Sequence, residues 1–366
     1  MTKLFMDETD VANAVHPVNW ISVGDDAFQA TTCLPKEYWD HADKAGFLGI
    51  DRAESGYEGL DVLPGGNAAL YLPVPSRNYD TILAENALSQ YVHQLTDLLE
   101  GTRLNALLAF LGKSFPSGIT PSLARLSQQQ GAVTVAVVSL PHPDEGRKHV
   151  LQSEFALKET QSNVDATCTL SLETMCDDQP QGISMTELES RIYILFNRAM
   201  RGIVDLTTFP GFRAPQVDDV VGFFRGAGEI LYGHSTIRQG SKGTLEAITH
   251  ALRNPYDDRR SFEGADEVLV SVCLGSDGLE QTCYRSIGRY CRNLLGNSTE
   301  VRVGCFRSVL ATEEPWIAVY GRGAREVRLS GFEYPLSQPP HPAKSPARLP
   351  AYYRKFYGQS IGGSLS

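Results

Sequence analysis

The segment best placed to bind a phosphate group is the run Leu111–Gly118, which reads Leu-Gly-Lys-Ser-Phe-Pro-Ser-Gly. It follows the apolar run Leu104–Phe110, which predicts a buried strand, and it precedes a helix predicted over Ile119–Leu126. A strand, a tight loop and a helix N-terminus together form a geometry that binds anions. Lys113 and Ser114 are similar to the Lys-Ser pair of a P-loop, but the complete G-x-x-x-x-G-K-S/T pattern is absent. The segment therefore predicts an altered anion site.

Two further segments, a strand and a charged turn, follow this run along the chain. Gly131–Pro141 contains the apolar pattern of a buried strand, and Glu145–Lys148 makes a charged turn. In this order the segments resemble FtsZ, the bacterial relative of tubulin. In that family a GGGTGTG loop leads through a helix to a TVAVVT-like strand and an FEGKKR-like turn. Gly112 and Gly118 match the two ends of the glycine loop, and the five residues between them do not.

The resemblance extends along most of the chain. Gly202–Leu206 resembles the end of the central FtsZ helix, and Glu263–Val272 resembles the start of the FtsZ C-terminal domain. The match is good over residues 95–323, weaker over residues 18–45 and poor over residues 54–79. It is the ordered series of segments, rather than any single motif, that carries the resemblance.

The resemblance implies a tubulin/FtsZ-like α/β fold with a Rossmann-type parallel-sheet domain, a long central helix and a smaller α+β C-terminal domain. Alternating strand and helix patterns before Leu172 also favour a parallel sheet covered by helices. Ser184 and Glu187 predict a capping box that begins the long helix. The expected parts are a flexible N-terminus (1–15), a GTPase-like nucleotide-binding domain (16–183), the central helix (184–207), the C-terminal domain (208–335), a Pro-rich linker (336–348) and a tail peptide (349–366).

Apolar periodicity and breakers predict the individual elements. We expect strands over residues 21–24, 47–50, 267–274, 300–309 and 317–321, and helices over residues 28–45, 80–99 and 281–295. Pro35 interrupts the first of these helices and Gly101 ends the second. Residues 54–79 are rich in Gly and Pro and give no clear prediction.

The first nucleotide loop of the family has a GGGGNN-like run, and Gly24-Asp25-Asp26 stands at its place here. Two carboxylates there would face a polyanion, and one like-charge pair at ~4 Å costs roughly 4 kcal/mol at an effective dielectric constant near 20. The alternative is that both Asp residues cap the following helix. We hypothesise that Lys113 pairs with Asp25 or Asp26 and fills the old phosphate site; the alternative is a solvated Lys113.

Other positions of the family's nucleotide site also depart from its pattern. In the second loop, Phe115 adds bulk and Pro116 removes a backbone donor. Glu145 matches the acid of the FEGKKR-like turn, although a solvated turn acid is an equally simple interpretation. His149, Leu172 and Ile194 replace the Arg, Asn and Asp that contact or support the guanine in the family.

The resemblance places the family's catalytic NxDxxD loop at residues 214–219. Ala214 replaces the Asn, Gln216 replaces the first Asp, and only Asp219 matches. One carboxylate can still orient a water molecule. The alternative is that Asp218 and Asp219 cap the helix that begins near Val220.

The end of the chain keeps a further feature of the family. The segment Leu349-Pro350-Ala351-Tyr352-Tyr353-Arg354-Lys355-Phe356 resembles the FtsZ tail peptide, which reads close to IPAFLRKQ. That peptide docks into grooves of membrane-tethering and regulatory division proteins. Aromatic side chains supply anchors and the two cations supply steering. The alternative is a generic basic aromatic tail.

The overall composition limits the classes of function. The formal charge is −10, and residues 336–366 carry four basic residues and no acid, so the rest of the chain is at −14 and is an unfavourable nucleic-acid binder. No apolar stretch is long enough to span a membrane, and residues 1–15 lack the apolar core of a signal peptide. Seven scattered Cys without C-x-x-C predict reduced cytosolic thiols, and the eight His show no zinc spacing.

These observations predict an FtsZ-like cell-division or cytoskeletal protein that acts as a non-hydrolysing scaffold, regulator or filament subunit. The alternatives are an active GTP-binding, polymerising GTPase with a rearranged site, and a nucleotide-independent filament former.

No cofactor is expected, with GTP and magnesium as the ligands if the site is competent. The expected partners are FtsZ or other division proteins, a second copy in a filament, and membrane-tethering proteins at the tail. The expected location is the cytoplasm, at the division site. Vestigial site residues are Gly24, Gly112, Ser114, Gly118 and Glu145 for GTP and Asp219 for catalysis.

Overall fold

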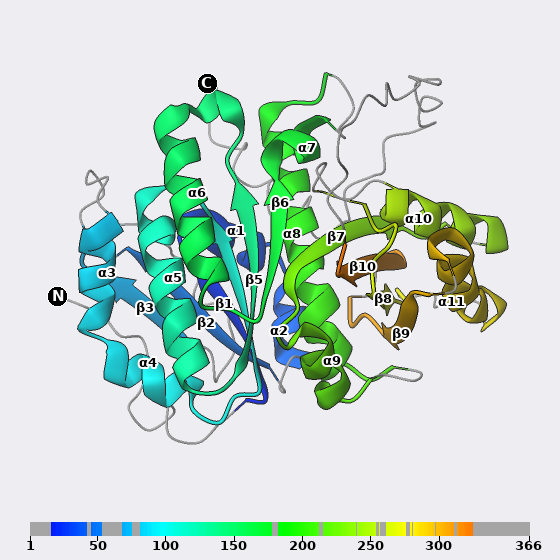
Figure 1. The fold of residues 1–366 in the computed structure, drawn as a ribbon, viewed down its shortest axis with the longest axis horizontal. Helices are drawn as coiled ribbons and strands as arrows, with labels where there is room; N and C mark the ends of the chain where they lie inside the picture. Colours follow the sequence, from blue (N-terminus) through cyan, green and yellow to red (C-terminus); the bar gives the residue numbers. More distant parts are fainter. Residues whose placement is uncertain are drawn as a thin grey trace, which may run out of the picture.

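The computed structural model describes residues 16–41, 45–52, 68–74, 81–177, 182–211, 215–238, 240–253, 256, 261–275, 279, 281–296, 298–310 and 313–324. Ten strands of this part form one sheet in the order β3-β2-β1-β4-β5-β6-β7-β10-β8-β9 (Figure 1). Helices cover both faces of the sheet. The α/β architecture expected from the sequence is therefore confirmed.

The first six strands form the parallel half of the sheet. They are β1 (Val18–Val23), β2 (Ala45–Arg52), β3 (Ala68–Leu72), β4 (Leu104–Phe110), β5 (Val133–Leu140) and β6 (Ala166–Ser171), and every neighbouring pair among them is parallel. The strands β1 and β4 are buried along their whole length, as apolar runs covered on both faces should be. β3 lies in the Gly- and Pro-rich stretch that gave no prediction, so the sequence missed it.

Two predicted helical stretches of this half each correspond to two separate helices in the structure. The helices of this half are α1 (Asp25–Thr32), α2 (Lys36–His41), α3 (Thr81–Ser89), α4 (Val92–Leu99), α5 (Ser114–Gln129), α6 (Arg147–Gln161) and α7 (Leu172–Asp177). The interruption predicted at Pro35 is confirmed, because it separates α1 from α2, but the helical prediction up to residue 45 is wrong at its end, since β2 begins at Ala45. The helix over residues 80–99 is likewise two helices, α3 and α4.

The central helix α8 (Met185–Thr208) has 24 residues and lies against strands of both halves of the sheet (Figure 1). The Oγ atom of Ser184 accepts a hydrogen bond from the backbone N–H of Glu187, so the N-terminus predicted for this helix is confirmed. From Tyr193 to Leu206 every residue of α8 is buried. Such a helix serves as the core of the molecule rather than as a surface element.

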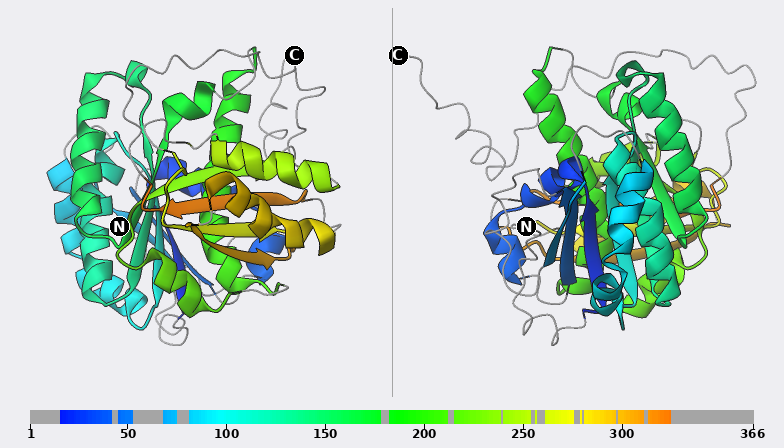
Figure 2. Two further views of the ribbon diagram at one scale, coloured as in Figure 1. Left: turned by 45° about the vertical axis from the view of Figure 1, so that its right-hand side comes forward. Right: turned by 90° about the vertical axis from the view of Figure 1, so that its left-hand side faces the viewer.

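The second half adds α9 (Val217–Phe224), β7 (Gly228–Thr236), α10 (Ser241–Arg253), β8 (Glu267–Cys273), α11 (Gln281–Leu295), β9 (Glu300–Phe306) and β10 (Trp316–Arg322). β10 lies between β7 and β8 and is antiparallel to both. β6 and β7 pair over Ala166–Cys168, which makes the two halves one sheet. Figure 2 shows α10 and α11 together on one side of these strands.

Within the described part, no helix is long and apolar enough to cross a membrane. None of the seven cysteines, all of which lie in the described part, forms a disulfide, and six of them are buried.

Candidate functional site

The two loops that would hold a phosphate meet at one edge of the sheet. Gly24 follows β1 and Leu111 follows β4, and these two parallel strands are neighbours. Helices α1 and α5 begin immediately after these loops. The carboxyl ends of neighbouring parallel strands and two helix N-termini therefore converge, which is the usual position of ligand sites in open α/β sheets.

Charged side chains join the two loops across this edge. The Nζ atom of Lys113 lies 2.6 Å from Oδ2 of Asp26 and 3.5 Å from Oδ1 of Asp25. Arg52, at the end of β2, adds a longer contact of 4.0 Å to Asp25. Burial alone would lower the pKa of Lys113, but the two carboxylates outweigh burial and raise it. The hypothesised ion pair of Lys113 is thus confirmed.

Apolar packing closes the same place sterically. Gly24 has a φ of 86°, and a Cβ atom at this position would lie 3.5 Å from three ring atoms of Pro116. The Pro116 ring therefore lies over Gly24 and leaves room for about one carbon atom between the ring and the backbone of the first loop. Tyr193 of α8 places its hydroxyl 3.1 Å from Oδ1 of Asp26, and its ring contacts Phe110 at 5.9 Å between centroids.

The backbone of the second loop is engaged internally. The N–H of Gly112 donates to Oγ of Ser117 at 3.0 Å, and the φ of Gly112 is 106°. In a phosphate-binding loop such an N–H points at the ligand instead. A Cβ atom at Gly112 would lie 3.2 Å from Pro141, so the loop also packs closely on the segment after β5.

Helix α5 begins at Ser114, five residues before the helix start predicted from the sequence. Ser114, Phe115 and Pro116 form its first three positions, where a missing backbone donor does no harm. Phe115 is 6% exposed and belongs to the apolar cluster between α5 and the sheet. The Ser114 Oγ atom is buried and has no hydrogen-bond partner among the described atoms.

Gly118 lies inside α5 and serves the contact between α5 and α3. A Cβ atom there would collide with the carbonyl oxygen of Thr81 and would lie 3.1 Å from Cβ of Ala84. The residue is needed where two helices approach closely, so the structure gives Gly118 a packing role away from the loop.

The turn acid Glu145 is occupied by its own turn. Its Oε1 atom accepts a 2.8 Å hydrogen bond from the N–H of His142, and Nδ1 of His142 accepts from the N–H of Asp144. These two bonds form a capping box around the short 3-10 turn Pro143–Glu145. Glu145 is exposed and acts as a local cap in this structure.

The matching acid of the catalytic loop is also used as a cap. Oδ2 of Asp219 accepts a 3.0 Å hydrogen bond from the N–H of Gln216, which completes a capping box at the start of α9. Asp218 pairs with Arg103 at the start of β4. Ala214 and the tail residues 349–356 lie outside the described residues.

The guanine-supporting position of the central helix is apolar as predicted. Ile194 is 7% exposed and lies in the large core around α8. Leu172, at the position of the family's Asn, begins α7 and packs on the edge of the same core. Neither side chain offers a hydrogen bond to a base.

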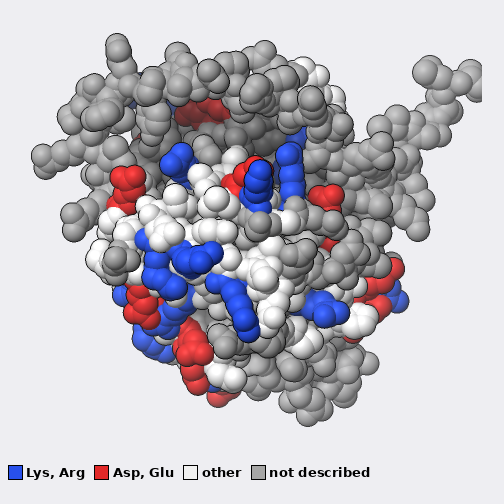
Figure 3. All heavy atoms as spheres, turned by 90° about the vertical axis from the view of Figure 1, so that its right-hand side faces the viewer, with Lys and Arg blue, Asp and Glu red and all other residues white. Residues whose placement is uncertain are grey.

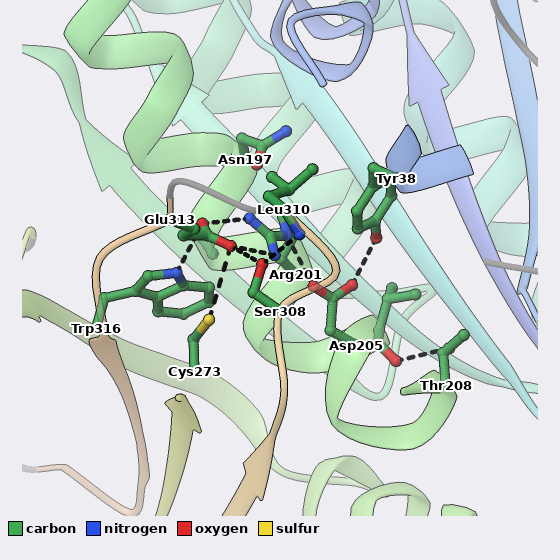
Figure 4. A network of polar contacts seen from close by, with 12 residues as sticks. Tyr38, Asn197, Arg201, Asp205, Thr208, Cys273, Ser308, Leu310, Glu313 and Trp316 are labelled. Atoms are coloured by element: carbon green, nitrogen blue, oxygen red, sulfur yellow. Dashed lines mark hydrogen bonds and ion pairs between the residues drawn. The ribbon is translucent and has the colours of Figure 1, made fainter. Parts of the chain in front are cut away.

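The sequence did not predict a buried charge network that is centred on two residues of α8, Arg201 and Asp205 (Figure 4). Arg201 makes a two-pronged ion pair with Glu313, with N–O distances of 2.6 and 2.9 Å, and its Nε atom lies 2.7 Å from Asp205. Tyr38 of α2 donates to Asp205 at 2.5 Å. The four residues are at most 1% exposed. The network therefore ties α2, α8 and the segment before β10 together.

Glu313 is the most heavily bonded acid of this network. Besides Arg201 it accepts hydrogen bonds from Ser308 and from Nε1 of Trp316, the latter at 3.0 Å. Burial would raise the pKa of Glu313, but Arg201 and Ser308 outweigh burial and lower it to about 2. Burial dominates at Asp205 and raises its pKa to about 6. A pair at i and i+4 in a helix, Arg201 and Asp205, was the only local signal of this network in the sequence.

The described residues contain no group of three His, Cys, Asp or Glu side chains that could hold a metal ion. The strongest charge cluster at the loop edge is instead an internal one, in which Lys113 and, at longer range, Arg52 balance the carboxylates of Asp25 and Asp26. Such an arrangement can stabilise the meeting of two loops, but it offers an incoming phosphate two acids and few free donors.

The search of protein-family models finds none that matches the chain. Among curated proteins, the chain is 26% identical to the cell division protein FtsZ of Pseudomonas aeruginosa over 234 residues, which are 63% of this chain and 59% of that protein. It is 24% identical to the cell division protein FtsZ of Wigglesworthia glossinidia brevipalpis over 241 residues, 66% of this chain and 62% of that protein. The match thus spans about three fifths of the length of these relatives.

Solved structures show the same fold. The empty FtsZ dimer of M. jannaschii aligns with a TM-score of 0.74 at 17% identity, covering 90% of this chain and 99% of that one. A GTPγS-bound protofilament of CetZ2 from Haloferax volcanii aligns with a TM-score of 0.62 at 17% identity, covering 84% and 93%. Both alignments cover more than four fifths of this chain and more than nine tenths of the solved structure.

Proposed function

Because the chain is a divergent member of the FtsZ/tubulin superfamily, we propose that it is a cell-division or cytoskeletal protein that works without hydrolysing GTP. It acts as a scaffold, regulator or filament subunit. The fold agrees with solved FtsZ over 90% of this chain, and the positions that the resemblance assigns to nucleotide make internal contacts here. Fold alone does not establish function, so the proposal depends on the site.

The contact between Lys113 and Asp26 carries the proposal. A phosphate that entered between the two loops would have to break this contact and would then face Asp25 and Asp26. A micromolar ligand has a binding free energy of only about 8 kcal/mol, and one like-charge contact removes a large part of it. Pro116 over Gly24 adds a steric obstacle to the electrostatic one.

The residues of these loops do not form a site that fits GTP and magnesium. The Gly112 N–H is bonded to Ser117, and Asp219 is bonded to the N–H of Gln216, so a donor and an acid that the family pattern would offer are already used. CetZ2 has been solved with GTPγS, and that property belongs to CetZ2. For this chain we derive no step through a bound nucleotide.

Equilibrium titration with fluorescently labelled GTP, with and without magnesium, tests the proposal. We expect no saturable binding up to millimolar nucleotide and no phosphate release. The FtsZ protein of P. aeruginosa, handled in parallel, is the matched positive control. Micromolar affinity with magnesium-dependent turnover would show instead an active GTPase with a rearranged site.

A second measurement separates a filament subunit from a monomeric scaffold. Sedimentation and negative-stain imaging are carried out without nucleotide and again with GTP. Filaments that form equally well in both cases identify a nucleotide-independent filament former. If the chain by itself stays in the supernatant but pellets together with added FtsZ filaments, it is a scaffold or regulator that binds those filaments.

A further inference from the structure

One side of α11 is a stripe of arginines. Arg285, Arg289 and Arg292 follow one another at i, i+4 and i+7, so they lie on one side of the helix, and all three are exposed. The opposite side carries the buried Ile287 and Cys291. The stripe therefore points away from the sheet and into solvent.

The neighbouring helix α10 repeats this arrangement. Its exposed side carries Lys242 and Arg253, and its buried side carries Ala247 and Ile248. Glu246 is the one acidic residue in the two helices. On a chain with a formal charge of −10, these two helices thus form a local cationic surface, which we call the α10/α11 layer.

The cations of the α10/α11 layer are not used in ion pairs, unlike several other basic residues of the described part. Elsewhere in the described part, Arg103 pairs with Asp218 and Arg191 pairs with Glu187. Within that same part of the chain, no ion pair involves the five cations of the layer, which are Lys242, Arg253, Arg285, Arg289 and Arg292. The layer is distinguished by having five such cations on two adjacent helices.

The α10/α11 layer is flat because both helices pack on the same face of β8 and β10. Ile248 of α10 and Ile287 of α11 share one apolar cluster with Val270 and Val319 of the sheet. The two helices also contact each other, and Figure 2 shows them side by side. Their outer sides consequently face the same direction. Figure 3 shows that Lys and Arg side chains gather on this side of the molecule.

We propose that the α10/α11 layer docks onto an anionic lipid surface. Guanidinium groups bind phosphate oxygens in a two-pronged manner, and a flat array of them matches a plane of headgroups. The arginine stripe spans roughly 10 Å, which is short for a track along a nucleic-acid backbone, whereas anionic lipids can diffuse and gather around it. Leu245 of α10 is 40% exposed and adds an apolar side chain to the layer.

The charge of the remaining surface fixes the orientation of such a complex. The chain outside the tail has a formal charge of −14, so most other faces are repelled by an anionic surface. The face that presents the α10/α11 layer brings five cations of two adjacent helices within about one Debye length of such a surface, ~10 Å at 0.1 M salt. This inference stands on charge and geometry and does not depend on the nucleotide site.

Co-sedimentation of the full chain with lipid vesicles tests the proposal. Vesicles of phosphatidylcholine alone are compared with a two-to-one mixture of phosphatidylcholine and phosphatidylglycerol. We expect binding to the mixed vesicles only, weakening with added salt. The triple variant Arg285→Gln, Arg289→Gln and Arg292→Gln is expected to lower the partition coefficient roughly a hundredfold, since each cation near an anionic leaflet contributes about a factor of five.

Two controls make the outcome specific. The triple variant Lys36→Gln, Arg147→Gln and Lys158→Gln removes the same charge from exposed positions outside the layer and should bind as the natural chain does. A chain lacking residues 349–366 should also still bind, because the layer is intact. Absence of binding by the natural chain, equal binding by both triple variants, or binding to nucleic acid in place of vesicles would overturn the proposal. Thermal melting verifies that each variant is folded.

Discussion

The Nζ atom of Lys113 lies 2.6 Å from Oδ2 of Asp26, which joins the N-terminus of α5 to the first turn of α1. The resemblance to FtsZ matches both residues to loops that have glycines or small residues in that family. The contact pairs a cation with an anion of the same chain, so the positive charge of Lys113 is already balanced without a bound anion. The same edge is closed by Pro116 against Gly24.

Removing this ion pair should change stability only slightly. Lys113 has 47% of its side chain exposed, so solvent screens the interaction, and a double-mutant cycle with Lys113→Gln and Asp26→Asn should give a coupling of about 0.5–1 kcal/mol. Urea unfolding of the four proteins measures it. The exposed pair Arg125 and Glu85, at 3.8 Å, is the reference cycle and should give less. A coupling of zero at Lys113 would mean that the two loops meet for other reasons.

Substituting Gly118 tests whether it is a packing residue. The change Gly118→Ala places a methyl group against the carbonyl oxygen of Thr81, so we expect a loss of about 1–3 kcal/mol of unfolding free energy. Gly222→Ala in α9 is the matched control, because no atom lies within 4 Å of its added Cβ. That control should be neutral or stabilising by up to about 1 kcal/mol. Equal effects of the two changes would contradict the packing role.

The sequence predicted those features that arise from local patterns. The apolar runs of β4, β5 and β8 and the cap at Ser184 gave correct elements. The Lys113 contact followed from the resemblance, which places its two loops at one end of the sheet. The sequence did not predict the early start of α5, because Ser-Phe-Pro carries little helical periodicity, although all three residues are acceptable in a first turn.

The buried network could not be predicted because its partners are distant in sequence. Arg201 and Glu313 are 112 residues apart, and Glu313 lies in a segment between strands that no periodicity marks. Its burial depends on how β10 inserts between β7 and β8. A charged residue at such a position looks like a surface residue until the sheet order is known.

Glu313 should make the fold sensitive to acid. Its pKa is about 2 in the fold against an ordinary value of 4.5, so its stabilising contribution is complete above pH ~4.5 and is lost as the pH falls through about 2. The shift corresponds to about 3 kcal/mol. Chemical unfolding between pH 2 and 7 should show this loss, and Glu313→Gln should flatten that part of the curve. The variant should also lose about 3–5 kcal/mol at neutral pH, because Arg201 keeps a buried charge without its partner.

Asp205 should act in the opposite direction. Burial raises its pKa from 3.8 to about 6, so the folded chain holds this proton more tightly and stability increases as the pH falls from about 6 to about 4. We expect Asp205→Asn to remove that increase while leaving the acid loss due to Glu313. The ratio of folded to unfolded protein at fixed urea, followed from pH 7 to pH 4, measures it. An unchanged slope in the variant would show that another group carries the proton.

Asp219 should behave as a helix cap. Its Oδ2 atom accepts the N–H of Gln216, so Asp219→Ala should lower the unfolding free energy by about 0.5–2 kcal/mol. Asp219→Asn keeps an acceptor oxygen and should recover most of the loss. Phosphate release from GTP, measured with the same proteins, should be equally absent in all of them. A rate that is present in the natural chain and disappears in both variants would instead assign Asp219 to catalysis.

Deleting Leu349–Ser366 should abolish partner binding and leave the fold intact. The deleted segment supplies four aromatic side chains and two cations beside Leu349-Pro350, which suit docking into an apolar groove of a membrane-tethering division protein. Thermal melting should give the same Tm with and without the segment. A fluorescent fusion should lose its concentration at the division site after the deletion. The double change Tyr353→Ala and Phe356→Ala should reproduce this loss, whereas Gly362→Ala and Gly363→Ala should not. Unchanged localisation of the shortened chain would show that the tail is a solvated arm and that the body carries the partner contact.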